Sequence, residues 1–176
     1  IDSILMRIAD ILFAYPALLL ALVVAGTLGR GIDKAMLAIG IVYAPQMARI
    51  IRSSVLSIKE MEYIEAEHAL GASNWRIVFK HVLPNSLAPL IVYSTLMLAT
   101  AILDAAALGF LGVGAQPPSP EWGLSLSIAR KYLVTGAWWA ATFPGIAILL
   151  SVISLNMLGD GLRDALDPRL KGGSKI

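Results

Sequence analysis

The side chains that most often carry out chemistry are sparse in this sequence, and their spacing matches no familiar catalytic site. There is no G-x-x-x-x-G-K-[ST] to bind nucleotide phosphates, and neither H-E-x-x-H nor G-x-S-x-G to hydrolyse a bond. Cysteine is absent, which removes disulfides and thiolate metal sites. The two histidines, His68 and His81, are far apart in a charged segment, and we interpret them as polar loop residues. We therefore expect no catalytic residue, no cofactor and no metal ion.

Acidic residues gather near the C-terminal end, where a metal site is the alternative to ordinary ion pairing. Asp160, Asp164 and Asp167 alternate with Arg163 and Arg169 at short spacings. Opposite charges three or four positions apart on a helix lie close together and attract one another. Ion pairs on a tail that faces solvent or a partner protein explain this pattern better than cation binding.

The composition indicates which elements must position any functional group. Apolar residues make up 57% of the chain and charged residues 15%, whereas an average soluble domain carries about 25% charge. A soluble protein of 176 residues could not bury this excess, because much of its surface must face water. The net charge of +2 is spread around apolar runs rather than gathered in one patch, so we expect no nucleic-acid partner. The sequence predicts an all-α protein in lipid.

Four apolar stretches are long enough, or nearly so, to cross a bilayer, which takes about 20 residues. We expect spans at 11–28, 35–48, 86–103 and 132–159. The second is short, so it must continue through Arg49 and Arg52, whose long side chains can reach the interface. One proline lies in each span, and we expect kinks rather than gating hinges at Pro16, Pro45, Pro89 and Pro144.

Basic residues are unequally distributed between the two sides of these spans, and the positive-inside rule uses this inequality to orient them. Four lie on one side, and ten lie on the other: Arg7, Arg49, Arg52, Lys59, Arg76, Lys80, Arg163, Arg169, Lys171 and Lys175. The richer side is therefore predicted to be cytoplasmic, together with the C-terminus. Residues 114–123 then lie outside, and 124–133 form a short helix along the outer interface or dipping back into the membrane.

The predicted cytoplasmic loop at 61–84 has the features of two short helices joined by a turn. Residues 61–70 favour a helix, Gly71 can adopt the left-handed conformation that ends it, and Ser73 can cap a second helix over 74–81. Apolar residues are expected on one face of the second helix: Trp75, Val78, Phe79 and Val82. Arg76 and Lys80 share a neighbouring stripe, and Leu83-Pro84 closes the unit. Such a surface suits docking into a groove on another protein.

The same loop resembles a pattern found in importer permeases driven by ABC-type ATPases: E-A-A, three residues, G, nine residues, I-x-L-P. The sequence matches it at Glu65, Ala66, Gly71, Leu83 and Pro84. It departs at Glu67, in place of the second alanine, and at His81, in place of isoleucine. Residues 109–123 (GFLGVGAQPPSPEWG) and 156–169 (NMLGDGLRDALDPR) are similar to segments of the dipeptide/oligopeptide/nickel subfamily. The resemblance covers essentially the whole chain.

The resemblance implies one permease domain of the type I importer fold over 1–176, a piece of a longer protein with two more spans upstream. It implies a second homologous permease, two cytoplasmic ABC ATPases and an extracytoplasmic binding protein, in a prokaryotic inner membrane. The implied function is to couple ATP hydrolysis by the partners to alternating access, without being an enzyme itself. Di- or oligopeptides are the expected substrates, with nickel complexes or glutathione as alternatives.

The resemblance implies ATPase coupling at Glu65, Ala66, Gly71, Leu83 and Pro84, and the aromatic residues Trp75 and Phe79 of the same loop are added as candidate anchors. The two aromatics are expected to anchor the loop in the ATPase, unless they merely pack it against the membrane helices. Asp104, an acid in an apolar context, either lines the translocation path or makes a hydrogen bond between helices. A passive channel or secondary transporter would give the loop no role, and a membrane enzyme would need a nucleophile–base pair that is not visible.

Overall fold

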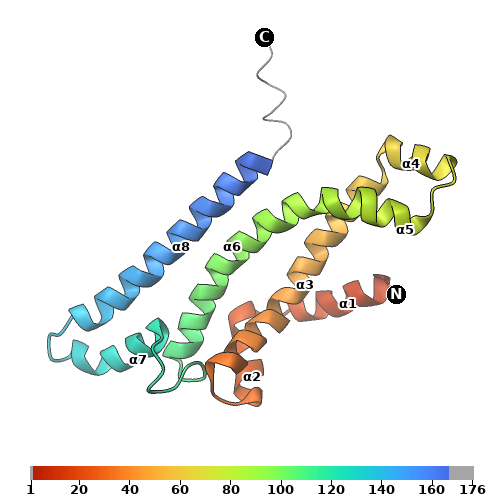
Figure 1. Ribbon diagram of the computed structural model, residues 1–176. Helices are drawn as coiled ribbons and strands as arrows, with labels where there is room; N and C mark the ends of the chain where they lie inside the picture. Colours follow the sequence, from red (N-terminus) through yellow and green to blue (C-terminus); the bar gives the residue numbers. More distant parts are fainter. Residues whose placement is uncertain (1, 167–176) are drawn as a thin grey trace, which may run out of the picture.

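The computed structural model describes residues 2–166, and this part of the chain is built from helices joined by short connections (Figure 1). Three helices of 28 residues dominate it: α3 (Ile32–Lys59), α6 (Leu83–Phe110) and α8 (Trp139–Leu166). The middle helix, α6, packs against both of the others. All three are long and apolar enough to cross a membrane. The predicted all-α fold and the second and third predicted spans are confirmed.

The kink expected at Pro16 is sharp enough to divide the first predicted span between two helices. Its residues belong to α1 (Asp2–Phe13) and α2 (Ala17–Leu28), which meet at an angle of 95°. Pro16 stands at the break, where its ring removes a backbone N–H and disfavours the helical conformation of the residue before it. The bent pair is apolar enough to count as one span, so the described residues hold three spans, or four with this pair. By contrast, Pro45, Pro89 and Pro144 lie inside continuous helices.

Two ion pairs and an aromatic contact hold α1 against α3. Arg49 Nη2 lies 2.7 Å from Asp10 Oδ1, and its guanidinium carbon lies 4.1 Å from the centre of the Phe13 ring. Arg52 binds both carboxylate oxygens of Asp2 at 2.8–3.0 Å. The two arginines predicted to reach the interface therefore also find partners on α1.

The fourth predicted span begins too early. The chain leaves α6 and forms α7 (Trp122–Leu133), which confirms the predicted short helix and takes up the first residues assigned to the span. Gly136, with φ 84°, lies in the turn that follows, and α8 begins only at Trp139. A glycine in the left-handed conformation is a common helix terminator, so the turn separates α7 from α8 and moves the start of the span to a later residue than the sequence suggested.

Glycine residues allow α7 and α8 to pack closely against α6. A Cβ added to Gly123 of α7 would lie 2.0 Å from the carbonyl oxygen of Ala106 in α6. A Cβ added to Gly159 of α8 would lie 2.9 Å from Thr95 Oγ1 and 3.2 Å from Leu96. Small residues of this kind let membrane helices approach closely, which is a main source of attraction between them in lipid.

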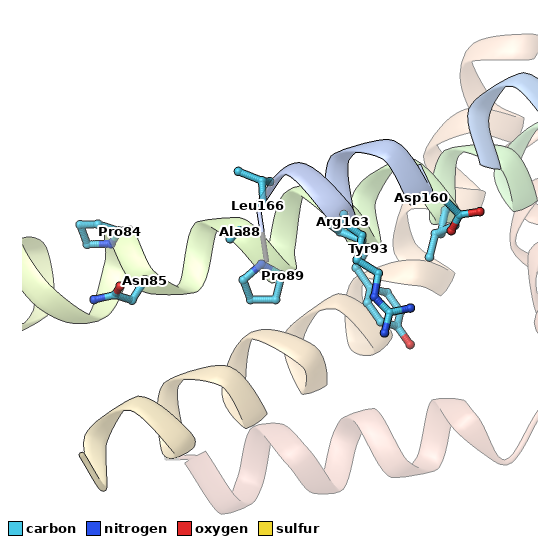
Figure 2. Close-up of a pocket in the computed structure, with 10 residues that line it drawn as sticks. Pro84, Asn85, Ala88, Pro89, Tyr93, Asp160, Arg163 and Leu166 are labelled. Carbon is cyan, nitrogen blue, oxygen red and sulfur yellow. The ribbon is translucent and has the colours of Figure 1, made fainter. Parts of the chain in front are cut away.

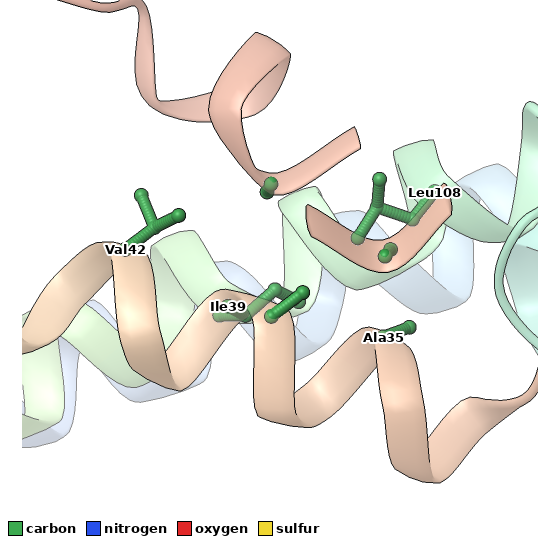
Figure 3. Close-up of a cluster of buried hydrophobic side chains, with 7 residues drawn as sticks. Ala35, Ile39, Val42 and Leu108 are labelled. Carbon is green, nitrogen blue, oxygen red and sulfur yellow. The ribbon is translucent and has the colours of Figure 1, made fainter. Parts of the chain in front are cut away.

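The main apolar core lies where α2, α3 and α6 meet, and small side chains predominate in it (Figure 3). Its buried members are Ala21, Ala25, Ala35, Ala38, Ile39, Val42 and Leu108. The outward faces of the same helices carry exposed large apolar residues, such as Val23, Met36 and Leu98. This arrangement, with small residues inside and large apolar residues outside, suits helices surrounded by lipid or by further membrane helices.

Candidate functional site

The loop predicted to couple to another protein lies at one end of the long helices, opposite the end that carries α7 (Figure 1). It consists of α4 (Glu62–Ala69), a turn, α5 (Asn74–Ile77) and a π-helical turn, η1 (Val78–Val82), which leads directly into α6. The predicted helix–turn–helix is therefore formed, and it is the part of the described chain that stands apart from the main bundle.

The turn between the two helices has the predicted conformation. Gly71 has φ 80°, in the left-handed region that a side chain disfavours, although a Cβ there would meet nothing within 4 Å. The requirement for glycine thus comes from the backbone rather than from lack of space. Ser73 caps the next helix, since its Oγ accepts a hydrogen bond from Arg76 N at 3.4 Å.

The predicted end of the second helix at Leu83-Pro84 is wrong. Helix runs without interruption from Asn74 to Phe110, and Pro84 lies in the first turn of α6. A proline ring clashes with the carbonyl four residues earlier in a regular α-helix. Here the preceding turn is a wider π-turn, in which the N–H of Leu83 bonds to the carbonyl of Val78, so the chain accommodates the proline without stopping.

The π-turn also changes which residues share a face. Val82, predicted to join the apolar face, is buried, while Trp75 and Phe79 are 73% and 60% exposed. Their rings stack with centroids 5.7 Å apart and planes 14° apart. The buried side of the loop is made instead by Ile58, Ile64, Ile77 and Val82. Among residues 2–166, the aromatic pair therefore does not pack against the membrane helices, which was the alternative to docking.

The remaining residues assigned to coupling are also accessible. Glu65 and Ala66 are exposed on α4, and Leu83 and Pro84 are exposed at the start of α6. Within residues 2–166, no basic side chain lies at ion-pair distance from Glu65. Its carboxylate is thus available to accept hydrogen bonds from a partner.

Four polar side chains, which the sequence did not single out as a group, meet where α4 faces η1 and the start of α6. His81 Nε2 lies 3.3 Å from Glu67 Oε1, and the imidazole lies 5.9 Å from the Tyr63 ring. Asn85 Nδ2 donates to Tyr63 Oη at 3.3 Å and to the carbonyl of His81 at 2.7 Å. In the described part of the chain, no three acidic or histidine residues are arranged to hold a metal ion. His81 is half-buried and has specific neighbours, so it is more than a polar loop residue.

Asp104 forms a hydrogen bond between helices. Tyr43 Oη of α3 donates to Asp104 Oδ2 of α6 at 2.7 Å. This bond is the structural role considered for the residue, and it satisfies a carboxylate that would be costly if left alone in lipid. A largely apolar groove of about 550 Å³ runs beside it between the two helices, lined by residues such as Met36, Met47 and Met97.

Two hollows flank α6 at the loop end, and neither could be predicted from a sequence pattern. The larger, about 610 Å³, lies between α6 and α8 and is lined by Tyr93, Asp160 and Arg163 among others (Figure 2). The smaller, about 420 Å³, lies on the α3 side and shares Asn85, Pro89 and Tyr93 with the first.

The structure describes three of the residues expected to form ion pairs in the C-terminal segment, Asp160, Arg163 and Asp164. Among the residues that the structure describes, neither Asp160 nor Asp164 lies at ion-pair distance from Arg163. Asp160 and Arg163 instead line the larger hollow separately. Asp167 and Arg169 lie outside the described residues.

Comparison with known proteins gives a consistent result. A family model described as "binding-protein-dependent transport system inner membrane component" matches residues 1–172. The chain is 53% identical over 171 residues to the dipeptide transport system permease protein DppC of Alkalihalophilus pseudofirmus, covering 97% of this chain and 56% of that protein. It is 50% identical over 170 residues to the di/tripeptide transport system permease protein DppC of Pseudomonas aeruginosa, with the same coverage. The glutathione transport system permease protein GsiD of Pectobacterium atrosepticum is 46% identical over 170 residues, again with 97% and 56% covered. The chain thus spans a little over half the length of these relatives.

Proposed function

Because the chain belongs to the family of inner membrane components of binding-protein-dependent transport systems, we propose that it is part of a permease subunit of an ATP-driven importer. In this role it catalyses no reaction. It receives movement from partner ATPases at the loop formed by α4, α5 and η1, and it converts that movement into alternating access across the membrane.

The observation that carries this proposal is the exposed aromatic pair on the loop. Trp75 and Phe79 stack on one another with most of their surface open to solvent. Burial of one such side chain in a partner is worth about 1.5–3 kcal/mol, and aromatic residues are enriched among interface hot spots. Glu65 adds an exposed carboxylate on the neighbouring helix. A passive channel or a secondary transporter, which works without an ATPase, leaves this surface unexplained.

The path of the movement follows from the continuity of the second helix. Helix extends over 37 residues from Asn74 to Phe110, a length of about 55 Å at 1.5 Å per residue. The helix therefore connects α5 to the membrane-spanning part of α6 through the π-turn η1, and a closing ATPase that displaces α5 moves α6 to the extent that η1 does not bend. The hollows on the two sides of α6 lie next to the moving end and can open or close as it shifts.

Substrates and partners follow from the relatives. Two of them are named for dipeptide or di/tripeptide transport and one for glutathione, which is itself a tripeptide. Di- and oligopeptides are accordingly the proposed substrates, with glutathione and nickel complexes as alternatives. The complete importer would contain a second homologous permease, two cytoplasmic ABC ATPases and an extracytoplasmic binding protein. The loop and the C-terminus would face the cytoplasm of a prokaryotic cell, by the positive-inside rule.

Two substitutions test the docking role directly. Gly71→Val places a β-branched residue at φ 80°, at a strain of about 1–3 kcal/mol, and Glu65→Lys reverses an exposed charge. In the complete importer, both should reduce co-purification of the ATPases and substrate uptake by about tenfold or more, with normal membrane insertion. Glu62→Lys, which changes another exposed acid of α4, is the matched control and should behave as wild type. Normal uptake by both Gly71→Val and Glu65→Lys would contradict the proposed function.

A further inference from the structure

The second helix of the loop has a weak point where it enters the membrane helix. The π-turn η1 (Val78–Val82) interrupts the regular hydrogen-bond pattern between α5 and α6. Such turns are rare and are often found at functional sites, since their wider bonds allow local bending. If η1 were the only connection, a movement of α5 could therefore bend the helix at η1 instead of moving α6.

A group of polar side chains bridges this weak point from outside. Tyr63 and Glu67 come from α4, His81 comes from η1 itself, and Asn85 comes from the first turn of α6. Asn85 Nδ2 contacts Tyr63 Oη at 3.3 Å and the carbonyl of His81 at 2.7 Å, so one amide ties α6 both to η1 and to α4. The contact between Tyr63 and Asn85 thus bypasses the π-turn, while the contacts of Glu67 and Asn85 with His81 hold the π-turn itself.

His81 is the centre of this group. Its Nε2 is buried and has no hydrogen-bond partner in the described part of the chain, yet it lies 3.3 Å from a carboxylate oxygen of Glu67. A buried polar nitrogen without a partner is uncommon in folded proteins, and the Glu67 carboxylate is placed to supply one after a small side-chain rotation. These are the two positions at which the loop departs from the permease pattern, and here they meet in space.

An apolar contact completes the attachment of α4. Ile64, 2% exposed, packs with Ile58, Ile77 and Val82 on the inner side of the loop. The polar group and this apolar cluster therefore hold α4 from both sides. Apart from them, the flexible turn at Gly71 would be the main link between the two helices.

We propose that Tyr63, Glu67, His81 and Asn85 form a polar latch that makes α4 and α6 move as one body across the π-turn. These four are positioning residues that transmit movement and do not touch the ATPase. The inference rests on the proposed function, in which an ATPase seats on the exposed face of the loop. Asn85 also lines both hollows beside α6, so the inner end of the latch reaches the region where access would change.

The latch predicts loss of coupling without loss of docking. In the complete importer, Glu67→Ala and His81→Ala should each lower the amount of substrate taken up per ATP hydrolysed by about tenfold, with ATPase co-purification within about twofold of wild type. The double variant should be no worse than the poorer single variant, since residues that act through one contact are not additive. Glu62→Ala and His68→Ala, which change exposed residues of the same helix, are the matched controls.

Conservative variants separate a positioning role from a merely structural one. Glu67→Gln keeps an acceptor and His81→Gln keeps a donor, so both should recover most of the uptake per ATP. The latch is overturned if the alanine variants match their controls, if their losses add in the double variant, or if folded glutamine variants stay as defective as alanine.

Retained ATPase binding by Gly71→Val and Trp75→Ala would instead contradict the proposed docking. Loss of binding in those two variants, with normal coupling in the latch variants, would overturn the latch alone.

Discussion

Replacing Gly123 by alanine introduces a methyl group where α7 touches the backbone of α6. The new Cβ would lie 2.0 Å from the carbonyl oxygen of Ala106 and 2.6 Å from its carbonyl carbon and Cα. Ordinary van der Waals contact begins at 3.4 Å, so the two helices would have to separate by roughly 1.4 Å in a close-packed region. Backbone atoms cannot rotate aside as a flexible side chain can.

The size of the effect follows from two contributions. Overpacking of a tight contact costs typically about 1–3 kcal/mol. Glu121 caps α7 by accepting hydrogen bonds from Gly123 N and Leu124 N, each at 2.7 Å, and disturbing such a cap costs about 1 kcal/mol. The total is about 2–4 kcal/mol, or roughly 5–15 °C in melting temperature for a protein of this size.

Thermal unfolding of the purified permease in detergent measures this effect. Gly145→Ala in α8 is the control, because a Cβ there meets nothing within 4 Å and alanine favours a helix over glycine by up to about 1 kcal/mol. We expect the control to melt at or slightly above the wild-type temperature. If Gly123→Ala melted within about 2 °C of wild type while the control behaved as expected, the close contact between α7 and α6 would be refuted.

Two further predictions concern topology and the acid in the membrane. An impermeant thiol reagent applied to intact cells should label Ser119→Cys and not Ser73→Cys, since the positive-inside rule places the loop in the cytoplasm; the opposite pattern would invert the topology. Asp104→Asn can still accept the hydrogen bond from Tyr43, so uptake should stay near normal if this bond is the main role of Asp104. Tyr43→Phe removes the donor and should lower stability by about 1–3 kcal/mol in the same melting assay. Loss of uptake in a well-assembled Asp104→Asn protein would show that the charge itself is needed.

The parts of the fold that the sequence predicted well are those fixed by local chemistry. The long uncharged runs form α3 and α6, because in lipid a segment must pair its backbone N–H and C=O groups internally, as a helix does. Gly71 and Ser73 took the conformations expected of a helix terminator and a helix cap, since both depend on neighbouring backbone atoms only.

The errors arose where distant contacts decide between local alternatives. Four prolines lie in the predicted spans, yet only Pro16 breaks a helix among the described residues. What distinguishes it is the attachment of α1 to α3 through Arg49 with Asp10 and Arg52 with Asp2, pairs separated by 39 and 50 positions. No sequence pattern within the first span predicts these partners.

The residues of the candidate site also differ in whether they are close together in the sequence or are brought together only by the fold. The residues of the proposed docking surface could be singled out because Glu65, Gly71, Trp75 and Phe79 lie on one short segment, where spacing fixes their relation. The groove and hollows that could carry a substrate are lined from several helices, and even the one bond between Tyr43 and Asp104 joins positions 61 apart. A loop that must meet a partner can be specified locally, whereas a path through the membrane exists only once α3, α6 and α8 have packed. For this reason the sequence singles out the residues proposed to receive movement more readily than the residues past which a substrate would move.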